Sequence, residues 1–485
     1  MKLETNIPEY YNDICEEIRL FVPDAEVAIG DRASDDGMTL SVDLAADGRF
    51  ASRVSFTRNG EVFSYSYETP HKGEDGIELK RYAKRNIKVA IFRCLRKTYP
   101  DRLIPWGSLT GIRPTRLLSE LEKSMGVSEA ERVMREEFDV SPEKIALAKE
   151  ITDVQRPVFA SAKPDDIGVY IGVPFCRTRC LYCSFASEVR TKKTDMSAYL
   201  DALAKDIVLG SAMTKELGLE PRSFYFGGGT PTVLTAEELD RILDVLTSAY
   251  PVAGKEFTVE AGRPDTITRE KLLVLKAYGV TRISVNPQTM CDRTLRLVGR
   301  DHTAEDIKRC FCEARGIGFG SINMDLIAGL PNEDERDMEH SLEEIKKLDP
   351  DCLTVHTLAI KRASRLKEHM SDYVLPSVET VERMVRLGRE CAKSMGMKPY
   401  YMYRQKYMAG NLENVGYSKE GHICVYNIDM MEDRMSIIAH GAGAMTKRVW
   451  PDGGRIERVP NPKDIATYIE KLPAVNAERK EMFKA

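Results

Sequence analysis

Between residues 167 and 370 the sequence repeats one pattern, a short apolar run followed by an amphipathic helical segment. The apolar runs are IGVYIGV, RSFYFGG, EFTVEA, TRISVN, GSINMDLIAGL and DCLTVHTL. Continuous apolar strands that alternate with helices predict an α/β fold with a parallel sheet covered by helices. Six strand–helix units are fewer than the eight of a closed barrel, so the pattern predicts an open, partial (β/α)6 TIM-like barrel.

The regions on either side of the repeat have a different pattern. Residues 1–105 contain TLSVDL, RFASRVSF and EVFSYSYE, an RNGE turn at 58–61 and a basic amphipathic stretch, which together predict an α+β N-terminal domain. Residues 106–165 predict a helical linker region that ends in SAKPDD. We place the barrel at 166–370 and predict a mostly helical C-terminal region at 371–485.

Composition argues against several classes of protein. The 485 residues carry a net charge of −4, which does not indicate a nucleic-acid-binding surface. No stretch approaches the ~18 continuous apolar residues of a membrane span, and the polar N-terminus lacks the apolar core of a signal peptide. Eight of the eleven cysteines are scattered, which is typical of buried thiols in a reducing compartment. We therefore expect a cytoplasmic protein without a membrane span or a nucleic-acid partner.

The other three cysteines follow the first apolar run directly, in YIGVPFCRTRCLYCSF. Cys176, Cys180 and Cys183 are separated by three and then by two residues. This loop is expected at the carboxyl ends of the strands, where parallel barrels carry their chemistry. Structural zinc normally takes four protein ligands, and no second pair of ligands is evident, although a zinc ion held by three cysteines is an alternative. Three thiolates on a [4Fe–4S] cluster leave one iron open to bind a small molecule.

A glycine motif, FGGGTPT, follows the second apolar run at residues 226–232. Glycines at the end of a strand let the backbone approach a ligand without a Cβ between them. A tight turn from strand to helix explains the same residues. Because neighbouring parallel strands end at one edge of a sheet, the motif is expected beside the cysteine loop.

The CxxxCxxC spacing resembles the signature of radical S-adenosylmethionine (SAM) enzymes. Their open iron binds the methionine amino and carboxylate groups, and electron transfer then yields a 5′-deoxyadenosyl radical. With VNPQTM, LVGR, NMDLIAGLP and HGAGAMT following in order, residues 165–450 resemble the oxygen-independent coproporphyrinogen III oxidase group. The N-terminal region and YRQKYMAGNLENVGY look most like its coproporphyrinogen dehydrogenase (HemZ) branch. The resemblance implies a barrel of the radical SAM type.

The resemblance also implies roles for individual residues. Cys176, Cys180 and Cys183 match the cluster ligands, and Tyr170 matches a tyrosine near the cluster and the substrate. The positions that match SAM contacts are Tyr182 and Ala359 at the adenine, Gly228, Gly229 and Thr230 at the amino group and sulfonium, and Glu260, Gln288, Arg300 and Asp325 at the ribose, amino-acid and adenine parts. Carboxylates accept hydrogen bonds from hydroxyl and ammonium groups, and an arginine can clamp a carboxylate.

For the reaction, the resemblance implies oxidative decarboxylation of coproporphyrinogen III to protoporphyrinogen IX. An electron donor such as flavodoxin or ferredoxin would supply electrons. The candidate partners of the substrate carboxylates are Arg177, Arg179, Arg263 and Arg404. Two departures bear on the substrate reaction. Gly172 stands where the decarboxylating enzymes have histidine, and the loop runs C-S-F at Cys183, which lacks their fourth cysteine and is closer to heme chaperones.

Two alternatives follow from these departures. A heme-binding protein of the same family would need an axial ligand, for which the sequence offers His356, His422 and His440. A radical SAM enzyme that acts on another porphyrin would use further catalytic cysteines, and the candidates are Cys291, Cys310, Cys312, Cys352 and Cys424.

Overall fold

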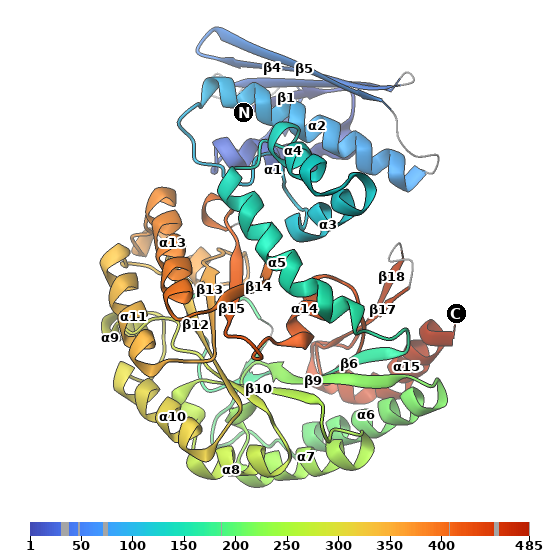
Figure 1. Cartoon of the computed structure of the whole chain (residues 1–485), viewed down its shortest axis with the longest axis vertical. Coiled ribbons are helices and arrows are strands. Elements are labelled where there is room, and N and C mark those ends of the chain that lie inside the picture. The colour runs from blue at the N-terminus through green and yellow to red at the C-terminus, as the bar shows by residue number, and fades with distance from the viewer. Residues whose placement is uncertain are drawn as a thin grey trace. The chain divides into compact units, whose positions relative to one another are not determined.

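The computed structural model describes residues 1–30, 38–46, 49–70, 76–185, 187–406, 408–450 and 455–484. The chain forms two compact units (Figure 1). The N-terminal unit comprises residues 1–149, 404–406 and 410–412, and the barrel unit comprises 150–403, 407–409 and 413–485. Among the described helices, none has both the length and the apolar composition needed to cross a membrane.

The N-terminal unit contains a five-stranded sheet in the order β2-β1-β3-β4-β5. The strands are β1 (Lys2–Thr5), β2 (Ala28–Ile29), β3 (Thr39–Ala46), β4 (Arg49–Arg58) and β5 (Glu61–Pro70). Asn59 and Gly60 form the predicted turn with positive φ angles of 52° and 84°, which suit a two-residue hairpin. Helices α1 (Tyr11–Phe21) and α2 (Gly76–Thr98) pack apolar side chains against this sheet.

Further helices follow in the N-terminal unit. They are α3 (Pro114–Met125), α4 (Val127–Glu136) and α5 (Pro142–Ala160), and the boundary between the units lies within α5. The chain also has short 3₁₀ helices at Pro8–Tyr10, Pro231–Val233, Pro264–Thr266, Met370–Asp372 and Ala409–Asn411.

The barrel unit is built on an eleven-stranded sheet in the order β14-β15-β13-β12-β11-β10-β9-β6-β16-β17-β18. Its parallel strands include β6 (Asp166–Val173), β9 (Glu220–Gly228), β10 (Glu256–Gly262), β11 (Arg282–Val285), β12 (Ser321–Ala328) and β13 (Cys352–Thr357). These are the six apolar runs of the sequence, so the predicted α/β fold is confirmed. β14 and β18 are the two edge strands of this sheet and do not pair with each other, so the barrel is open.

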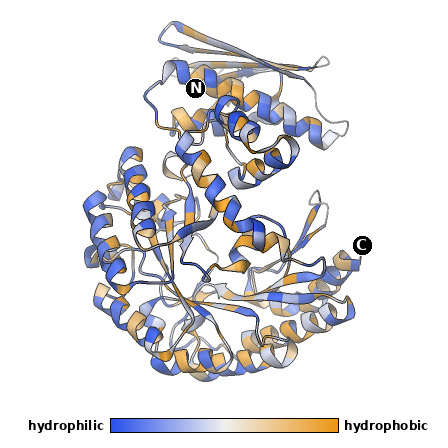
Figure 2. Ribbon diagram, in the orientation of Figure 1, coloured by the Kyte–Doolittle hydropathy of each residue, from blue (hydrophilic) through white to orange (hydrophobic). Residues whose placement is uncertain are grey.

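Amphipathic helices cover the outer face of this sheet (Figure 1). They are α6 (Ser197–Glu216), α7 (Ala236–Ala249), α8 (Arg269–Ala277), α10 (Ala304–Ile317), α11 (Glu335–Leu348) and α13 (Val378–Ser394). The short helices α9 (Asp292–Leu297) and α12 (Arg365–Glu368) lie in the connections that follow β11 and β13. Hydrophobic and hydrophilic residues alternate along the longer helices (Figure 2). Thr235, Thr303 and Asp334 begin three of them with capping boxes, which satisfy the first backbone N–H groups.

The C-terminal region is less helical than the sequence pattern predicts. It contains α13, α14 (Val425–Met431) and α15 (Ile465–Lys484). It also contains β14 (Lys398–Tyr403), β15 (Asn414–Ser418), β16 (Ser436–His440), β17 (Met445–Val449) and β18 (Ile456–Pro460), and all five join the barrel sheet. These strands are short and lack a long periodic pattern, so the sequence does not predict them. Their conformation depends on pairing with an existing sheet edge. β16 pairs in parallel with β6, so it adds a parallel strand that the sequence analysis missed.

Candidate functional site

The cysteine loop begins where β6 ends. β7 (Phe175–Cys176) and β8 (Glu188–Val189) pair in parallel and hold the two sides of the loop together. Burial raises the pKa of the Cys183 thiol, and the nearby Cys180 and Cys176 raise it further, so the three sulfurs influence one another. In the described part of the chain, no three cysteine, histidine or acidic side chains are arranged to hold a metal ion as they stand.

The glycine motif lies directly beside this loop, as predicted. Gly229 N–H donates to the carbonyl of Val173, and Thr230 N–H donates to the carbonyl of Phe175, each at 2.8 Å. A Cβ on Gly228 would lie 2.9 Å from the Val173 nitrogen, and φ of Gly228 is 110°. The neighbouring backbone therefore requires glycine here. The Thr230 hydroxyl lies 3.6 Å from the sulfur of Cys176 and joins the two motifs.

Glu260 extends from the end of β10 into an aromatic environment. The Tyr225 hydroxyl donates to Glu260 Oε1 at 2.5 Å, and a Cβ on Gly227 would lie 3.1 Å from Oε2, so glycine makes room for the carboxylate. Burial raises the pKa of Glu260 to about 7, and nearby Asp325 contributes to the shift. Tyr225 stacks on Tyr426 at 4.6 Å between ring centroids and on Tyr170 at 6.3 Å. Tyr170 on β6 therefore lies two strands away from Glu260 on β10, with Tyr225 on the strand between them.

Asp325 lies at the corresponding position on β12. Asn323 donates to its carboxylate at 2.7 Å, and His356 Nε2 lies 3.6 Å away. Burial by itself would raise the pKa of Asp325, but His356 and Asn323 lower it overall. The backbone of Gln288 pairs with this strand, because its N–H donates to the Asp325 carbonyl at 2.8 Å. Gln288 has a φ of 69°, a left-handed conformation that is strained for glutamine.

Arg300 connects the cysteine loop with the end of β11. Its guanidinium donates to the carbonyl of Asn286 at 2.5 Å and contacts the Tyr182 hydroxyl and the Cys180 thiol. Burial raises the pKa of Tyr182, although Arg300 opposes the shift. Ala359 is half-buried after the end of β13 and bridges to Met408. The predicted site residues thus lie at the carboxyl ends of the parallel strands.

A cavity of ≈ 220 Å³ lies among these strands. Glu260 and Asp325 line it, together with Phe185 of the cysteine loop. The inward pairs on successive strands are Thr258 and Glu260, Arg282 and Ser284, Asn323 and Asp325, and Thr354 and His356. Apolar branched side chains usually fill the interior of a parallel barrel, so a polar interior indicates a binding surface.

Several cavity residues were missed by the sequence analysis. Tyr225, Arg282, Asn323, Tyr401 and Tyr403 all line the cavity. The signal available in the sequence is a polar side chain at every second position of strands that are otherwise apolar. That alternation shows which residues share a face, but the aromatic residues of β14 come into place only because this strand joins the sheet.

The four arginines proposed to bind substrate carboxylates have protein partners instead. Arg177 donates to the Asp265 carbonyl at 2.9 Å, and Arg179 donates to the Ala363 carbonyl at 2.7 Å. Arg263 is 3% exposed and pairs with Asp265. Arg404 belongs to the N-terminal unit, where it donates to the Leu109 carbonyl at 2.6 Å. The described wall of the cavity includes none of the four.

The candidate heme ligands differ in their surroundings. His356 lines the cavity, and its Nδ1 lies 3.2 Å from the Tyr403 hydroxyl. His440 is fully buried away from the cavity lining, between Asp206 at 3.2 Å and the Tyr250 hydroxyl at 3.0 Å. Of the further candidate cysteines, Cys424 lines the cavity, where burial raises the pKa of its thiol.

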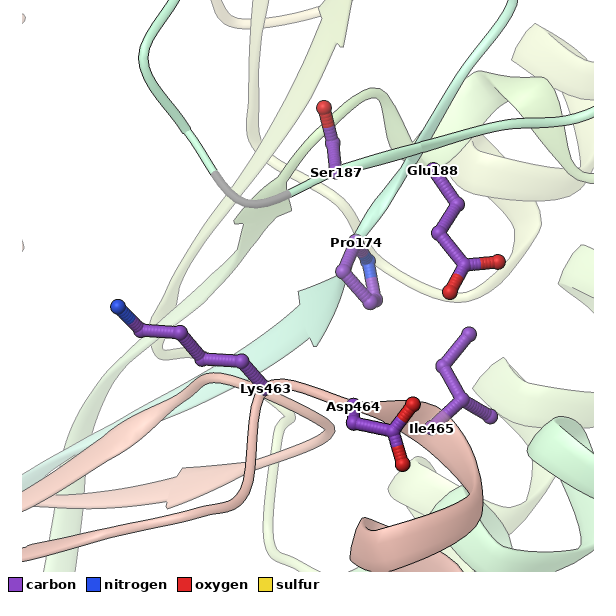
Figure 3. Close-up of a pocket in the computed structure, with 6 residues that line it drawn as sticks. All are labelled: Pro174, Ser187, Glu188, Lys463, Asp464 and Ile465. Atoms are coloured by element: carbon purple, nitrogen blue, oxygen red, sulfur yellow. The ribbon is translucent and has the colours of Figure 1, made fainter. Parts of the chain in front are cut away.

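A second cavity of ≈ 220 Å³ lies between the base of the cysteine loop and the start of α15 (Figure 3). Its walls are Pro174, Ser187, Glu188, Lys463, Asp464 and Ile465. Asp464 accepts a hydrogen bond from the backbone N–H of Thr467 at 2.8 Å, which caps the helix. None of the predicted site residues belongs to this cavity.

The residues around Arg300 fit an amino-acid ligand. Asn286 Oδ1, Gln288 Oε1 and Arg300 Nε are buried and have no hydrogen-bond partner among the residues that the structure describes. A buried polar atom without a partner costs about 1–3 kcal/mol, so a ligand that supplies the partners is favoured. Two amide oxygens and a guanidinium N–H complement the ammonium and carboxylate groups of SAM, and the three thiols suit an iron–sulfur cluster.

Comparison with known proteins agrees with this arrangement. Residues 170–345 match the Radical SAM superfamily. The chain is 42% identical to the oxygen-independent coproporphyrinogen-III oxidase-like protein HemZ of Bacillus subtilis over 77% of this chain and 76% of that protein. It is 36% identical to the heme chaperone HemW of Bacillus subtilis over 40% of this chain and 50% of that protein. The solved structure of coproporphyrinogen III oxidase (HemN) from Escherichia coli shares the fold, with a TM-score of 0.53, 23% identity and coverage of 67% and 73% of the two chains.

Proposed function

Because the chain belongs to the oxygen-independent coproporphyrinogen-III oxidase-like family of radical SAM proteins, with a [4Fe–4S] cluster and SAM as cofactors, we propose that it oxidatively decarboxylates coproporphyrinogen III to protoporphyrinogen IX. The observation that carries the proposal is the polar and aromatic cavity at the carboxyl ends of the strands. Its wall combines Glu260 and Asp325 with a cluster of tyrosines, which suits a site for both cofactor and substrate.

The residues of the chain have separate tasks in this reaction. Cys176, Cys180 and Cys183 hold the cluster, and Arg300 with Glu260 binds the polar groups of SAM. When bound, these cofactors supply the one-electron chemistry that removes a hydrogen atom from the substrate. Each propionate loses one β-hydrogen atom, carbon dioxide and one electron, and it becomes a vinyl group. The electron passes to an external one-electron acceptor.

The aromatic side chains of the cavity orient the substrate and exclude water from it. Tyr225 lines the cavity, donates to Glu260 and is backed by the stacked ring of Tyr170, and Tyr403 donates or accepts at His356 Nδ1. Flat aromatic faces suit the pyrrole rings of a porphyrinogen. A small one-electron carrier such as flavodoxin or ferredoxin would reduce the cluster from outside.

A second candidate function is heme binding, which two observations favour. His356 lines the cavity with a ring nitrogen toward Asp325, a position from which an axial ligand could be supplied. The similarity to the heme chaperone HemW, and the C-S-F sequence at Cys183, point the same way. Under this alternative the protein would bind heme without changing it.

The test is an anaerobic assay of the reconstituted, reduced protein with SAM and coproporphyrinogen III, read by mass spectrometry. The proposal expects loss of two carboxyl groups with stoichiometric 5′-deoxyadenosine. Cleavage of SAM without a change in the porphyrinogen would discard this substrate. A Cys176→Ala variant, which lacks one cluster ligand, is expected to form neither product.

Heme titration separates the second candidate from the first. Heme that binds through His356 would show an altered absorbance spectrum in a His356→Ala variant. His422→Ala is the matched control, because His422 is also half-buried but lies outside the cavity lining. Tight heme binding that needs His356, together with no vinyl product, would favour the chaperone function.

A further inference from the structure

Arg263 lies immediately after β10, beside the cysteine loop. Its side chain is 4% exposed and makes a two-point pair with Asp265, with Nε–Oδ1 at 3.0 Å and Nη2–Oδ2 at 3.1 Å. Paired N–H···O bonds of this kind fix the plane of the guanidinium. Asp265 also faces His302, whose Nδ1 lies 3.4 Å from its carboxylate.

The remaining guanidinium nitrogen, Nη1, reaches the cysteine loop. It donates to the Thr178 hydroxyl at 2.8 Å and lies 3.6 Å from the sulfur of Cys180. The Thr178 hydroxyl continues this chain by donating to the Gly299 carbonyl at 2.8 Å. The arginine therefore fixes the segment between the first two cysteines and presents a charged N–H to one of their sulfurs.

We propose that Arg263 is a positioning residue for the cluster, which holds the Thr178–Cys180 segment and makes the cluster easier to reduce by donating to the Cys180 sulfur. Reduction adds a negative charge to the cluster and its thiolates, and a nearby cation with an N–H donor stabilises that charge. Hydrogen bonds to the sulfurs are among the features that set the potential of an iron–sulfur cluster. The inference needs no porphyrinogen, so it stands or falls separately from the proposed substrate.

The chain offers a matched control in Arg177. It also pairs with Asp265, through Nε at 3.6 Å, and its Nη1 donates to the Asp265 carbonyl. Its side chain is 51% exposed, and its described partners are oxygen atoms of Asp265 and Asp301, with no sulfur among them. A loss of Arg177 therefore removes a neighbouring charge of the same sign without removing a donor to Cys180.

The experiment is an electrochemical titration of the reconstituted full chain, followed by the electron paramagnetic resonance signal of the reduced cluster. For R263Q we expect the equilibrium constant of one-electron reduction to fall about tenfold, which is a decrease of about 59 mV in midpoint potential. R263K keeps the charge but cannot reproduce the planar fork, so an intermediate shift is expected. R177Q is expected to change the constant less than twofold.

A second measurement uses the protein without its cluster. Alkylation of Cys180, mapped by mass spectrometry, is expected to be several-fold faster in R263Q than in the parent or in R177Q, because the Thr178 anchor is lost. If R263Q does not take up a cluster, the midpoint potential is measured on R263K instead. An unchanged potential in the cluster-loaded Arg263 variants would overturn the proposal, and so would an equal shift in R177Q.

Discussion

Two carboxylates of the barrel unit, the fully buried Asp206 and the half-buried Glu260, have opposite surroundings. Asp206, on α6, accepts from Arg479 Nη1 at 2.6 Å, the Tyr468 hydroxyl at 2.8 Å and the Gly441 N–H at 3.0 Å. Burial alone would raise the pKa of Asp206, but Arg479 and His440 hold it well below its usual range. Glu260 instead accepts from Tyr225, lines a cavity and has a raised pKa of about 7.

The difference separates a structural carboxylate from one that is placed to bind a ligand. The partners of Asp206 come from β16 and α15, so this carboxylate joins the C-terminal region to α6. Asn286, which lines the same cavity as Glu260, has a buried side-chain oxygen that no described residue contacts with a hydrogen bond, and so does Gln288 beside β12. A protein keeps such a polar surface only where something else supplies the missing hydrogen bonds.

The largest expected effect is on stability, in Asp206→Ala. This variant leaves the buried Arg479 without its carboxylate, which costs about 3–5 kcal/mol in the free energy of unfolding. Urea denaturation measures the loss. Asp206→Asn is the milder companion, since the amide still accepts a hydrogen bond. A decrease of less than about 1 kcal/mol in the free energy of unfolding of the alanine variant would show that Asp206 is not a structural carboxylate.

The next effect is on cofactor binding, in Glu260→Gln. Loss of a charged acceptor is expected to weaken SAM binding by about 1.5–3 kcal/mol, roughly 10- to 100-fold. Anaerobic calorimetry on the cluster-loaded protein measures it. The matched control is Glu333→Gln: Glu333 is 6% exposed, accepts from Thr289 at 2.6 Å and has a pKa that burial raises to about 7, but it lies outside the cavity lining. Equal losses in the two variants would contradict a direct contact.

A smaller effect is expected in the pH dependence of stability. The pKa of Glu260 is raised from 4.5 to about 7, so folding favours its neutral form. The resulting contribution to the free energy of unfolding is complete below pH 4.5 and is lost as the pH rises through 7. Without cofactor, the parent should lose about 1–2 kcal/mol relative to Glu260→Gln between pH 5 and 8. Denaturation of both proteins across this range measures the difference. Parallel stability curves would show that Glu260 ionises normally.

The smallest stability effect is expected for Gln288→Gly. Glycine adopts a φ of 69° without strain but adds freedom to the unfolded chain, so the two contributions nearly cancel, to within about 1 kcal/mol. The loss of the buried Oε1 should nevertheless weaken SAM binding. Thermal unfolding and calorimetry together test this. A variant that loses stability but binds SAM normally would indicate a purely structural glutamine.

Much of the site was predictable because its signals are local. The cysteine spacing and the six apolar runs are local features of the sequence, and a loop after a parallel strand must lie at the carboxyl edge of the sheet. The hydrogen-bond and ion-pair partners of Arg263 and His440 were not predictable in this way. Both were candidates for ligand binding, yet Arg263 pairs with Asp265 and His440 with Asp206.

The sequence by itself determined the fold class, the six parallel strands and the position of the cysteine loop, because periodicity and spacing act over a few residues. Only the tertiary structure decided that five C-terminal strands complete the sheet and that the barrel interior is polar. It also decided which buried charges are matched. Arg479 and Asp206 are 273 positions apart in the chain, and such a pair depends on how distant elements pack rather than on any local pattern.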